Sequence, residues 1–247
     1  MEEYNDKIEG RNSVIELLKA GKDINKLYIQ KGEKKGSILE IIKLAKQNKI
    51  IMSEIEKTKL DQMSETKNHQ GVIAIVPPYE YADVDDILDA AKKKNEDPFI
   101  IILDEIEDPH NLGSIIRTAE CAGAHGIIIP KRRSALVNST VVKTSAGATS
   151  YMKVARVNNL NETIEYLKEH NVWVYGTDML GSSYYDEQDY KGGVAIVVGS
   201  EGEGMGRLIK EKCDFLIKIP MKGKINSLNA SVSAAIVMYE VMKQRRS

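Results

Sequence analysis

The stretch VAIVVGSEGEGMG, residues 194–206, decides the fold class of this chain. Its first five residues are all apolar, which is typical of a β-strand buried on both faces. Such strands belong to parallel sheets that helices cover on both sides. The run then enters a glycine-rich loop, where missing side chains expose backbone N–H and C=O groups. The stretch therefore predicts a central strand of an α/β sheet, followed either by a ligand-binding loop or by a plain tight turn.

The glycine-rich loop does not match the known phosphate-binding loops. Its four glycines have neither the G-x-G-x-x-G spacing of dinucleotide sites nor the Gly-Lys-Ser/Thr ending of a P-loop. Two carboxylates, Glu201 and Glu203, stand where phosphates would lie, and like charges repel one another. The loop therefore suits a neutral or cationic ligand. The glycines are Gly199, Gly202, Gly204 and Gly206.

Predicted strands alternate with predicted helices over residues 98–247, and we expect these residues to form one parallel-sheet domain. Apolar runs predict strands, and segments with apolar residues at helical spacing predict helices. The predicted strands are 99–104, 126–130, 172–179, 194–200 and 215–220, and the predicted helices are 111–123, 160–170 and a long C-terminal one.

The N-terminal part predicts a smaller α/β domain over residues 1–78. Helices are expected at 10–21 and at 37–49, the second capped by Ser37, and short strands at 24–30, 50–55 and 71–76. Residues 79–97 contain acidic residues and a short helical pattern close to prolines, so we expect a linker there.

Composition limits the classes of function. Apolar residues make up 42% of the chain and charged residues 29%, with a formal net charge of -1, so no general attraction to nucleic acid is expected. Local basic patches remain open at 131–133 and 222–224. Cys121 and Cys213 have no metal-ligand spacing, and neither a leader peptide nor an apolar run of about 18 residues is seen. We therefore expect a reduced, cytoplasmic protein without metal or membrane contact.

Two further segments carry polar residues beside predicted strands. In 104–130, Asn111 opens a helix and Arg117 follows six residues later; alone, these are equally a helix cap and a surface ion-pair residue. In 215–242, a polar loop with Ser227 and Asn229 precedes a helix rich in Ala and Ser, which by itself means only tight packing.

Together the three segments resemble the SpoU family of RNA ribose 2'-O-methyltransferases, the TrmH-like branch of the SPOUT superfamily. The family's motifs are matched by DPHNLGSIIRTAECAGA, VVGSEGEGM and IPMKGKINSLNASVSAA, in the expected order. VVKTSAGA at 141–148 is a further similar stretch, and EGRNSVIELLKAG and NHQGVIAIV resemble the family's small RNA-binding domain. Within the family the chain looks closest to enzymes that methylate a guanosine ribose of large-subunit (23S) ribosomal RNA.

The resemblance implies several properties that the residue patterns do not. It implies a deep trefoil knot in the C-terminal domain, a bent S-adenosylmethionine bound in the knot, and a homodimer that completes the site. Ribosomal RNA is the implied substrate, and Lys26, Lys31, Lys34 and Lys35 are candidates for contacting it. Two alternatives stay open: a transfer-RNA ribose methyltransferase, and a non-catalytic RNA-binding assembly factor on the same fold.

The resemblance also implies the site residues. Gly199, Ile219 and Leu228 would give main-chain contacts to the cofactor, and Glu203 would face solvent while the other loop glycines keep the turn tight. Because a guanidinium stays protonated above pH 12, we expect Arg117 to bind the ribose oxygen and a phosphate rather than act as a base. Glu201 would hold Arg117 or Asn111 in place. The implied catalytic set is Asn111, Arg117, Glu201, Ser227 and Asn229.

Overall fold

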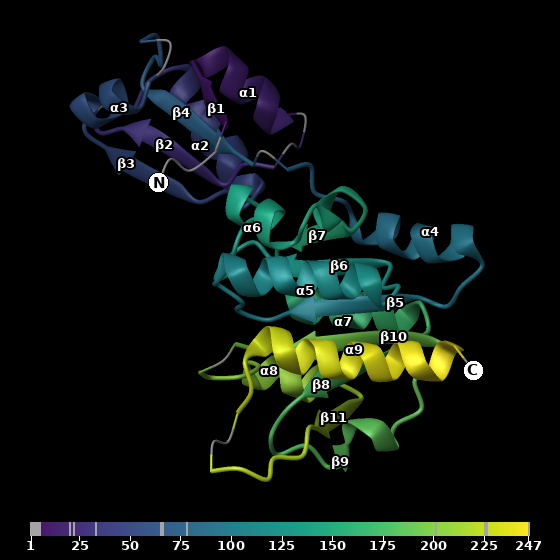
Figure 1. Ribbon diagram of the computed structural model, residues 1–247. Helices are drawn as coiled ribbons and strands as arrows, with labels where there is room; N and C mark the ends of the chain where they lie inside the picture. Colours follow the sequence, from purple (N-terminus) through teal and green to yellow (C-terminus); the bar gives the residue numbers. More distant parts are fainter. Residues whose placement is uncertain are drawn as a thin grey trace. The chain divides into compact units, whose positions relative to one another are not determined.

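The computed structural model describes residues 6–19, 21, 23–32, 34–64, 67–77, 79–200, 202–224 and 227–246 (Figure 1). The chain divides into two compact units, residues 1–80 and 81–247. Each unit has its own sheet and its own buried apolar cluster.

The first unit is a four-stranded mixed sheet with helices on both faces. Its strands are β1 (Asp6–Glu9), β2 (Lys26–Gln30), β3 (Met52–Ile55) and β4 (Val72–Val76), in the order β1-β4-β2-β3. Strands β2 and β3 are parallel, and β4 runs antiparallel to both β1 and β2. Helices α1 (Arg11–Lys19) and α2 (Ser37–Gln47) pack on one face and α3 (Lys57–Met63) packs on the other.

The start of α2 differs from the sequence prediction. The residue that caps the helix is Gly36, with φ 60°, and no side-chain cap hydrogen bond is formed there. Ser37 is instead the first helical residue, so the predicted cap at Ser37 is wrong. Gly36 occupies this place because its φ lies in the left-handed region that glycine adopts readily.

The second unit is a seven-stranded sheet in which every neighbouring pair of strands is parallel, in the order β7-β6-β5-β10-β8-β11-β9. This confirms the predicted α/β class with a parallel sheet. The strands are β5 (Phe99–Leu103), β6 (Gly126–Pro130), β7 (Lys153–Val157), β8 (Val172–Thr177), β9 (Ser183–Tyr184), β10 (Gly193–Val198) and β11 (Phe215–Lys218). The helices are α4 (Val84–Lys94), α5 (Pro109–Cys121), α6 (Ser139–Thr144), α7 (Leu160–Glu169), α8 (Arg207–Lys212) and α9 (Ala230–Arg246).

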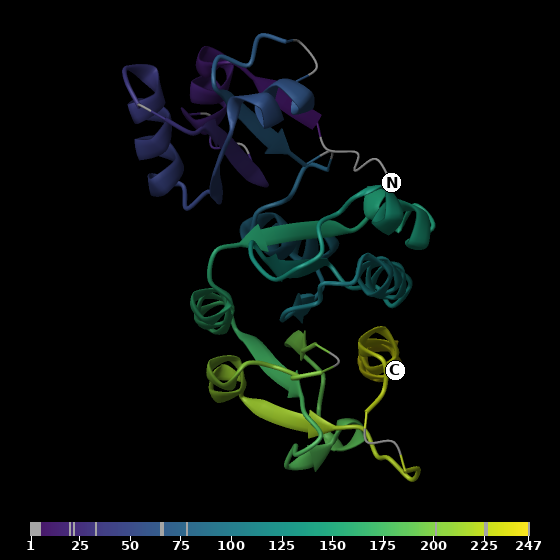
Figure 2. The ribbon, with the colours of Figure 1, turned by 90° about the vertical axis from the view of Figure 1, so that its left-hand side faces the viewer.

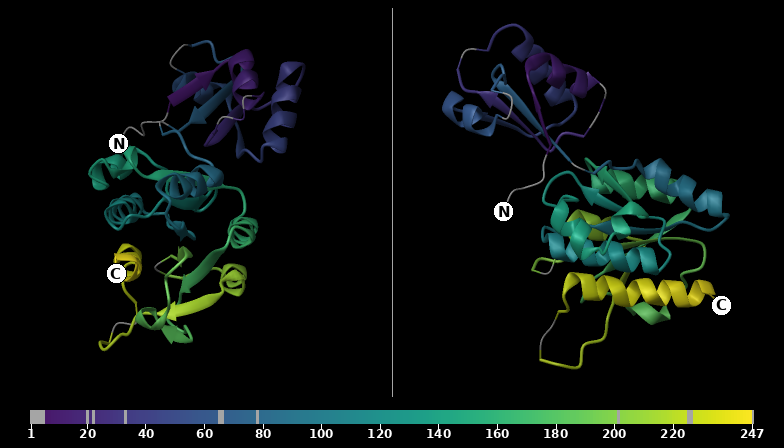
Figure 3. Two further views of the ribbon diagram at one scale, coloured as in Figure 1. Left: turned by 90° about the vertical axis from the view of Figure 1, so that its right-hand side faces the viewer. Right: turned by 45° about the horizontal axis from the view of Figure 1, so that its top comes forward.

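Helices cover both faces of this sheet, as the continuous apolar strands require. All residues of β5 and β10 are buried. Helices α4, α7 and α8 pack on one face in a single apolar cluster with the sheet, while α5 and α9 lie on the opposite face (Figure 2). Helices α5 and α9 run side by side (Figures 1 and 3). Central strands buried in this way leave ligands access only at strand ends.

The acidic stretch before β5 belongs to the second unit. Its helix, α4, buries Ile87 completely in the core of that unit. An added Cβ at Gly126 would lie 2.5 Å from two carbons of the Ile87 side chain, so glycine at the start of β6 makes room for α4. Residues 84–94, which we expected inside a linker, thus act as one of the helices that cover the sheet.

Candidate active site

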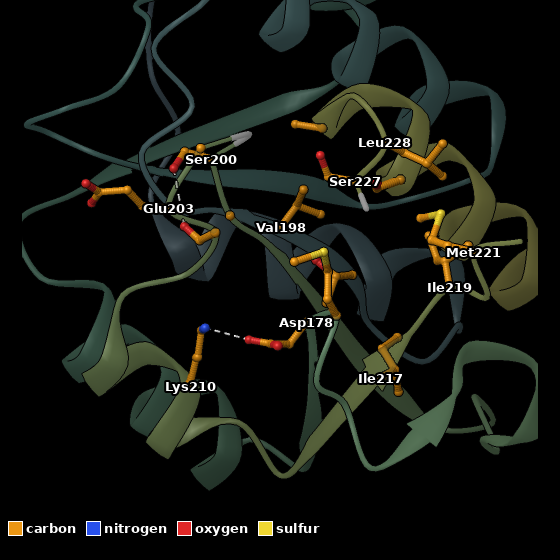
Figure 4. Close-up of a pocket in the computed structure, with 17 residues that line it drawn as sticks. Asp178, Val198, Ser200, Glu203, Lys210, Ile217, Ile219, Met221, Ser227 and Leu228 are labelled. Atoms are coloured by element: carbon orange, nitrogen blue, oxygen red, sulfur yellow. Dashed lines mark hydrogen bonds and ion pairs between the residues drawn. The ribbon is translucent and has the colours of Figure 1, made fainter. Parts of the chain in front are cut away.

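A pocket opens where the carboxyl ends of β8, β10 and β11 meet the start of α9 (Figure 4). Parallel strands bring their carboxyl ends to one edge of a sheet, so loops far apart in sequence converge there. The lining residues are Thr177–Met179 after β8, Val198–Ser200 and Gly202–Gly204 after β10, Lys210 on α8, Ile217, Ile219 and Met221 along and after β11, and Ser227, Leu228, Ala230 and Ser233 around the start of α9.

The glycine-rich loop folds back on itself beside this pocket. The Ser200 N–H donates to Gly204 O at 3.1 Å, and the Gly204 N–H donates to Ser200 O at 3.0 Å. Gly199 lies so close to the returning chain that an added Cβ would be 2.2 Å from the Gly204 carbonyl carbon. Gly204 has φ 69°, whereas Gly202 has no atom within 4 Å of an added Cβ and Gly206 only ordinary contact. Of the four glycines, Gly199 and Gly204 therefore shape the turn, and the prediction that Gly202 and Gly206 do so is wrong.

The three predicted cofactor residues all line this one pocket. Gly199 lies in the loop after β10, and Ile219 and Leu228 lie at the two ends of the loop between β11 and α9. The predicted catalytic residue Ser227 lines the pocket with them. Glu203 is exposed and also lines it. Glu201, for which we predicted a catalytic role, lies outside the described residues.

Two predicted catalytic asparagines are joined directly. Asn229 Nδ2 donates to Asn111 Oδ1 at 3.0 Å, and Asn229 Oδ1 accepts from the N–H and the hydroxyl of Ser231 at 2.9 and 2.6 Å. Asn229 is therefore the cap of α9 and the link from α9 to α5. Asn111 does not cap α5; that cap is Asp108, which accepts from the His110 N–H at 2.9 Å. Asn111 instead lies buried in the first turn of α5.

A second hollow adjoins the pocket and contains Asn111. It shares Ser200 and Glu203 with the pocket, and Glu105, Glu107 and Asp108 also line it. Arg133 is the basic residue of this hollow and forms a 2.5 Å ion pair with Glu105. The hydrogen bond that Arg133 donates to the Glu105 carboxylate raises the pKa of Arg133 above its ordinary value. The buried amide of Asn111 thus lies in a polar hollow that adjoins the pocket.

Arg117 does not join the other described site residues within one chain. It is exposed on α5 and lines neither hollow. Among the residues that the structure describes, it has no hydrogen-bond or ion-pair partner. Asn111 and Arg117 project to different sides of α5, so a single chain leaves the predicted catalytic set incomplete.

Sequence reasoning missed an ion pair in the pocket wall. Asp178 Oδ2 lies 2.6 Å from Lys210 Nζ, and Asp178 Oδ1 accepts from the Leu180 N–H at 2.8 Å. Burial raises the pKa of Asp178, but the hydrogen bonds from Lys210 and Leu180 and the Lys210 charge together lower it below its ordinary value. The available signal was the position of Asp178 near the carboxyl end of the predicted strand 172–179, because that end of a parallel strand lies at the ligand-binding edge.

The described residues contain neither a metal-binding cluster nor a membrane-spanning helix. No group of three or more His, Cys, Asp or Glu side chains there could hold a metal ion. No helix in the described ranges is long and apolar enough to cross a membrane.

Comparisons with known proteins show the family of this chain. Residues 98–239 match the model of the SpoU rRNA Methylase family, and residues 7–82 match a model described as RNA 2'-O ribose methyltransferase substrate binding. The chain belongs to the SpoU/TrmH family of RNA methyltransferases.

Relatives span the whole chain. The YacO protein of Bacillus subtilis (strain 168), whose name places it in the TrmH family of tRNA/rRNA methyltransferases, is 52% identical over 99% of this chain and 98% of its own length. The AdoMet-bound rRNA methyltransferase from Sinorhizobium meliloti has a TM-score of 0.59 at 25% identity, covering 97% of this chain and 87% of that one. The SpoU methyltransferase AviRb from Streptomyces viridochromogenes, in complex with AdoMet, shares the fold with a TM-score of 0.61 at 22% identity, covering 98% and 91%.

Proposed function

We propose that this protein transfers the methyl group of S-adenosylmethionine to the ribose 2'-oxygen of a guanosine in 23S ribosomal RNA. The observation that carries the proposal is the meeting, at one sheet edge, of a pocket lined by Gly199, Ile219 and Leu228 with the hydrogen-bonded pair Asn111–Asn229. The first three would hold the cofactor by their backbone, and the asparagines would face the ribose.

The residue types fit this chemistry. Methyl transfer to a hydroxyl is an in-line displacement on an already activated sulfonium, so the protein needs mainly to position the reactants and to manage one proton. Ile219, Leu228 and Val198 give the pocket apolar walls for an uncharged adenosine, and the exposed backbone of the glycine-rich loop offers hydrogen bonds. Ser227 would contact the reacting groups from the same wall, and Glu201 would orient Asn111 or Arg117.

Ribosomal RNA is the favoured substrate because the chain carries a separate N-terminal unit and shares its fold with an rRNA methyltransferase over nearly its whole length. A transfer-RNA substrate is the second candidate, since the name of the 52% identical relative covers both RNA classes. An rRNA substrate implies a cytoplasmic protein. In this proposal residues 1–78 bind RNA and residues 98–247 form the knotted catalytic domain, while α4 of the expected linker 79–97 packs on the sheet of the catalytic domain.

The exposed face formed by α5 and α9 supports a homodimer. Val232 and Tyr239 lie seven residues apart on α9, hence on one side of the helix, and are 46% and 47% exposed. Arg117 is exposed on α5, which packs beside α9. A second copy on this face would bury the two apolar side chains. It would also place side chains of the partner subunit next to Arg117, which is exposed in one chain.

The test is direct methyl transfer in vitro. Purified protein is incubated with tritiated S-adenosylmethionine and, separately, with total 23S rRNA and total tRNA from a strain that lacks the gene. We expect tritium in 23S rRNA at a 2'-O-methylguanosine. Tritium in tRNA alone selects the second candidate, and cofactor binding without transfer to either RNA selects the non-catalytic assembly factor.

The role of Arg117 is tested separately with Arg117→Lys. If the cation stabilises the ribose oxygen as it becomes negative, lysine restores part of the rate that Arg117→Ala loses, about 100-fold, and adds no new ionisation to the pH–rate profile. A rate that rises through a new apparent pKa of a lysine amine would instead make residue 117 the base.

A further inference from the structure

The first unit carries a polar hollow of its own, which we call the polar cradle. Three cations line it, Arg11 at the start of α1, Lys57 at the start of α3, and Lys67 in the loop before β4. The amides of Gln30 and Gln70 line it as well. None of these residues belongs to the site described above.

The loop that forms one wall of the cradle has an unusual backbone. Lys67 has φ 58° and Gln70 has φ 50°, both in the left-handed region that residues with a Cβ rarely adopt, and Gly71 follows with φ 82°. Such conformations persist only where neighbouring groups enforce them, and they gather at ligand sites. Neighbouring groups must therefore hold this backbone in place.

Two side chains hold the loop from opposite directions. The buried ring of His69 accepts the Gly71 N–H at Nδ1, at 2.9 Å, and its Nε2 lies 2.8 Å from Asp61 Oδ1. Arg11 donates from Nε to Gln70 O at 2.9 Å, and its backbone N–H donates to the Gln70 side chain at 3.1 Å. The loop is thus fixed before any ligand arrives, which lowers the entropy cost of binding.

The charges of the cradle indicate the chemistry of its ligand. Lys57 and Lys67 are exposed, and Asp61, the one acidic side chain among the described residues of the lining, is engaged by His69. Cations suit phosphate oxygens, and amides suit base edges and ribose hydroxyls. A concave site can enclose a whole nucleotide only where that nucleotide is unstacked, because the bases of an A-form duplex are paired and stacked and present only their edges, in a deep major groove or on a shallow minor groove.

We infer that the polar cradle binds one unstacked nucleotide of a single-stranded RNA segment, with Lys57 and Lys67 on its phosphates and Gln30 on its base or sugar. This inference rests on the proposed RNA substrate. It names the residues of the first unit that would contact the RNA, which the proposed function does not. His69 and Asp61 are positioning residues, since they hold the loop and not the ligand.

The experiment uses the full chain and the variant pair Lys57→Ala/Lys67→Ala. The matched control, Lys43→Ala/Lys59→Ala, removes two exposed lysines of the same unit outside the cradle, one of them on the same helix as Lys57. The probes are a fluorescein-labelled 12-nucleotide single-stranded RNA of mixed sequence and the matching duplex, with Kd measured by anisotropy at several salt concentrations. S-adenosylmethionine binding is measured by calorimetry on every variant.

We expect the cradle variant to bind the single strand about 5- to 20-fold more weakly, with the slope of log Kd against log salt reduced by about 1.4 for two lost phosphate contacts. Duplex binding should change less than about twofold, as should every property of the control. Wild-type affinity and slope in the cradle variant overturn the inference, as does an equal loss on the duplex or in the control. Because the cofactor pocket lies in the other unit, wild type that binds neither cofactor nor RNA would instead overturn the proposed function.

Discussion

At the scale of the residue, the site depends on how closely two backbone segments approach at Gly199. The glycine lines the pocket, and its missing side chain lets Gly204 return to within hydrogen-bond distance of Ser200. Gly199 therefore has a packing role, which the structure shows directly. Under the proposed function the backbone at this point also contacts the uncharged part of the cofactor.

Replacing Gly199 with Ala should damage the fold and the pocket together. The new Cβ would meet backbone atoms of Gly204 and Met205 at 2.2 and 2.3 Å, which forces the loop apart. We expect a loss of about 2–3 kcal/mol in the free energy of unfolding and at least a tenfold weaker binding of S-adenosylmethionine. Urea titration and calorimetry measure these. Gly202→Ala is the control, because an added Cβ there has no neighbour within 4 Å, and its free energy of unfolding should stay within about 0.5 kcal/mol of wild type.

Asn229 has two roles that one substitution separates. Asn229→Asp keeps the oxygen that caps α9 but removes the amide that donates to Asn111. We expect a midpoint of thermal unfolding close to wild type and a methyl-transfer rate lowered about tenfold or more. Asn229→Ala, which loses the cap as well, should also cost about 1 kcal/mol of stability. A fully active Asn229→Asp enzyme would show that the contact with Asn111 is structural only.

The Asp178–Lys210 pair predicts a dependence of stability on pH. The folded-state pKa of Asp178 lies below the ordinary value of 3.8, so the pair stabilises the fold fully above that value, and this stabilisation is lost as the pH falls through the lowered pKa. Asp178→Asn should therefore lower the free energy of unfolding by about 1–2 kcal/mol at neutral pH, and the difference from wild type should shrink toward zero as the pH falls below 3.8 and through the lowered pKa. Urea titrations across this range measure it; a difference that stays constant with pH would mean that packing, not charge, holds the side chain.

At the scale of the element, the sequence predicted the central strands of the larger sheet better than its edge strand β7 or the helix α4. The central strands β5 and β10 are continuous apolar runs because helices cover both of their faces, and the sequence shows this directly. Strand β7 lies at the edge of the sheet, is only partly buried, and was not predicted, since KVARV gives no continuous apolar run. The helix α4 was placed in a linker because its sequence is acidic, although Ile87 anchors it in the core.

The same contrast holds for the site: residues in sequence motifs were predicted, and residues that only the fold brings together were not. The loop residues Gly199, Ile219, Leu228 and Ser227 were predicted from motifs and share one pocket. The Asp178–Lys210 pair was not predicted, because it joins a strand end to a helix that comes 32 positions later and only the fold brings them together. The sequence spacing of six residues already predicts that Asn111 and Arg117 project from different sides of their helix, and in the structure Asn111 is buried and Arg117 is exposed.

The α5–α9 face yields a prediction about assembly. Val232→Asp/Tyr239→Asp places two charges on the exposed apolar side of α9, which should disfavour a dimer through this face because each charge would be buried without a partner. We expect light scattering to report a dimer for wild type, a monomer for the variant, and methyl transfer lowered at least tenfold. Leu208→Asp is the control, since Leu208 is 55% exposed on α8, on the opposite face of the sheet, and it should remain dimeric and active. A dimeric variant would move the interface elsewhere.

At the scale of the whole molecule, the chain has two units with separate cores, and our two proposals give each unit its own role. The second unit contains the pocket and the asparagine pair, and the first contains the polar cradle. Neither unit needs a strongly basic net charge, because the cations that matter are grouped at a few positions while acidic residues balance them elsewhere. This is why composition alone gave no sign of an RNA-binding protein.

The central claim is that the chain methylates a guanosine ribose of 23S rRNA. The most direct measurement maps all ribose 2'-O-methyl groups in 23S rRNA and in tRNA from a wild-type strain, a strain lacking this gene, and that strain complemented with the wild-type gene or with Asn229→Asp. We expect one guanosine of 23S rRNA to lose its methyl group in the deletion strain and to regain it only with the wild-type gene. An unchanged 23S rRNA pattern together with a lost methyl group in tRNA would contradict the central claim.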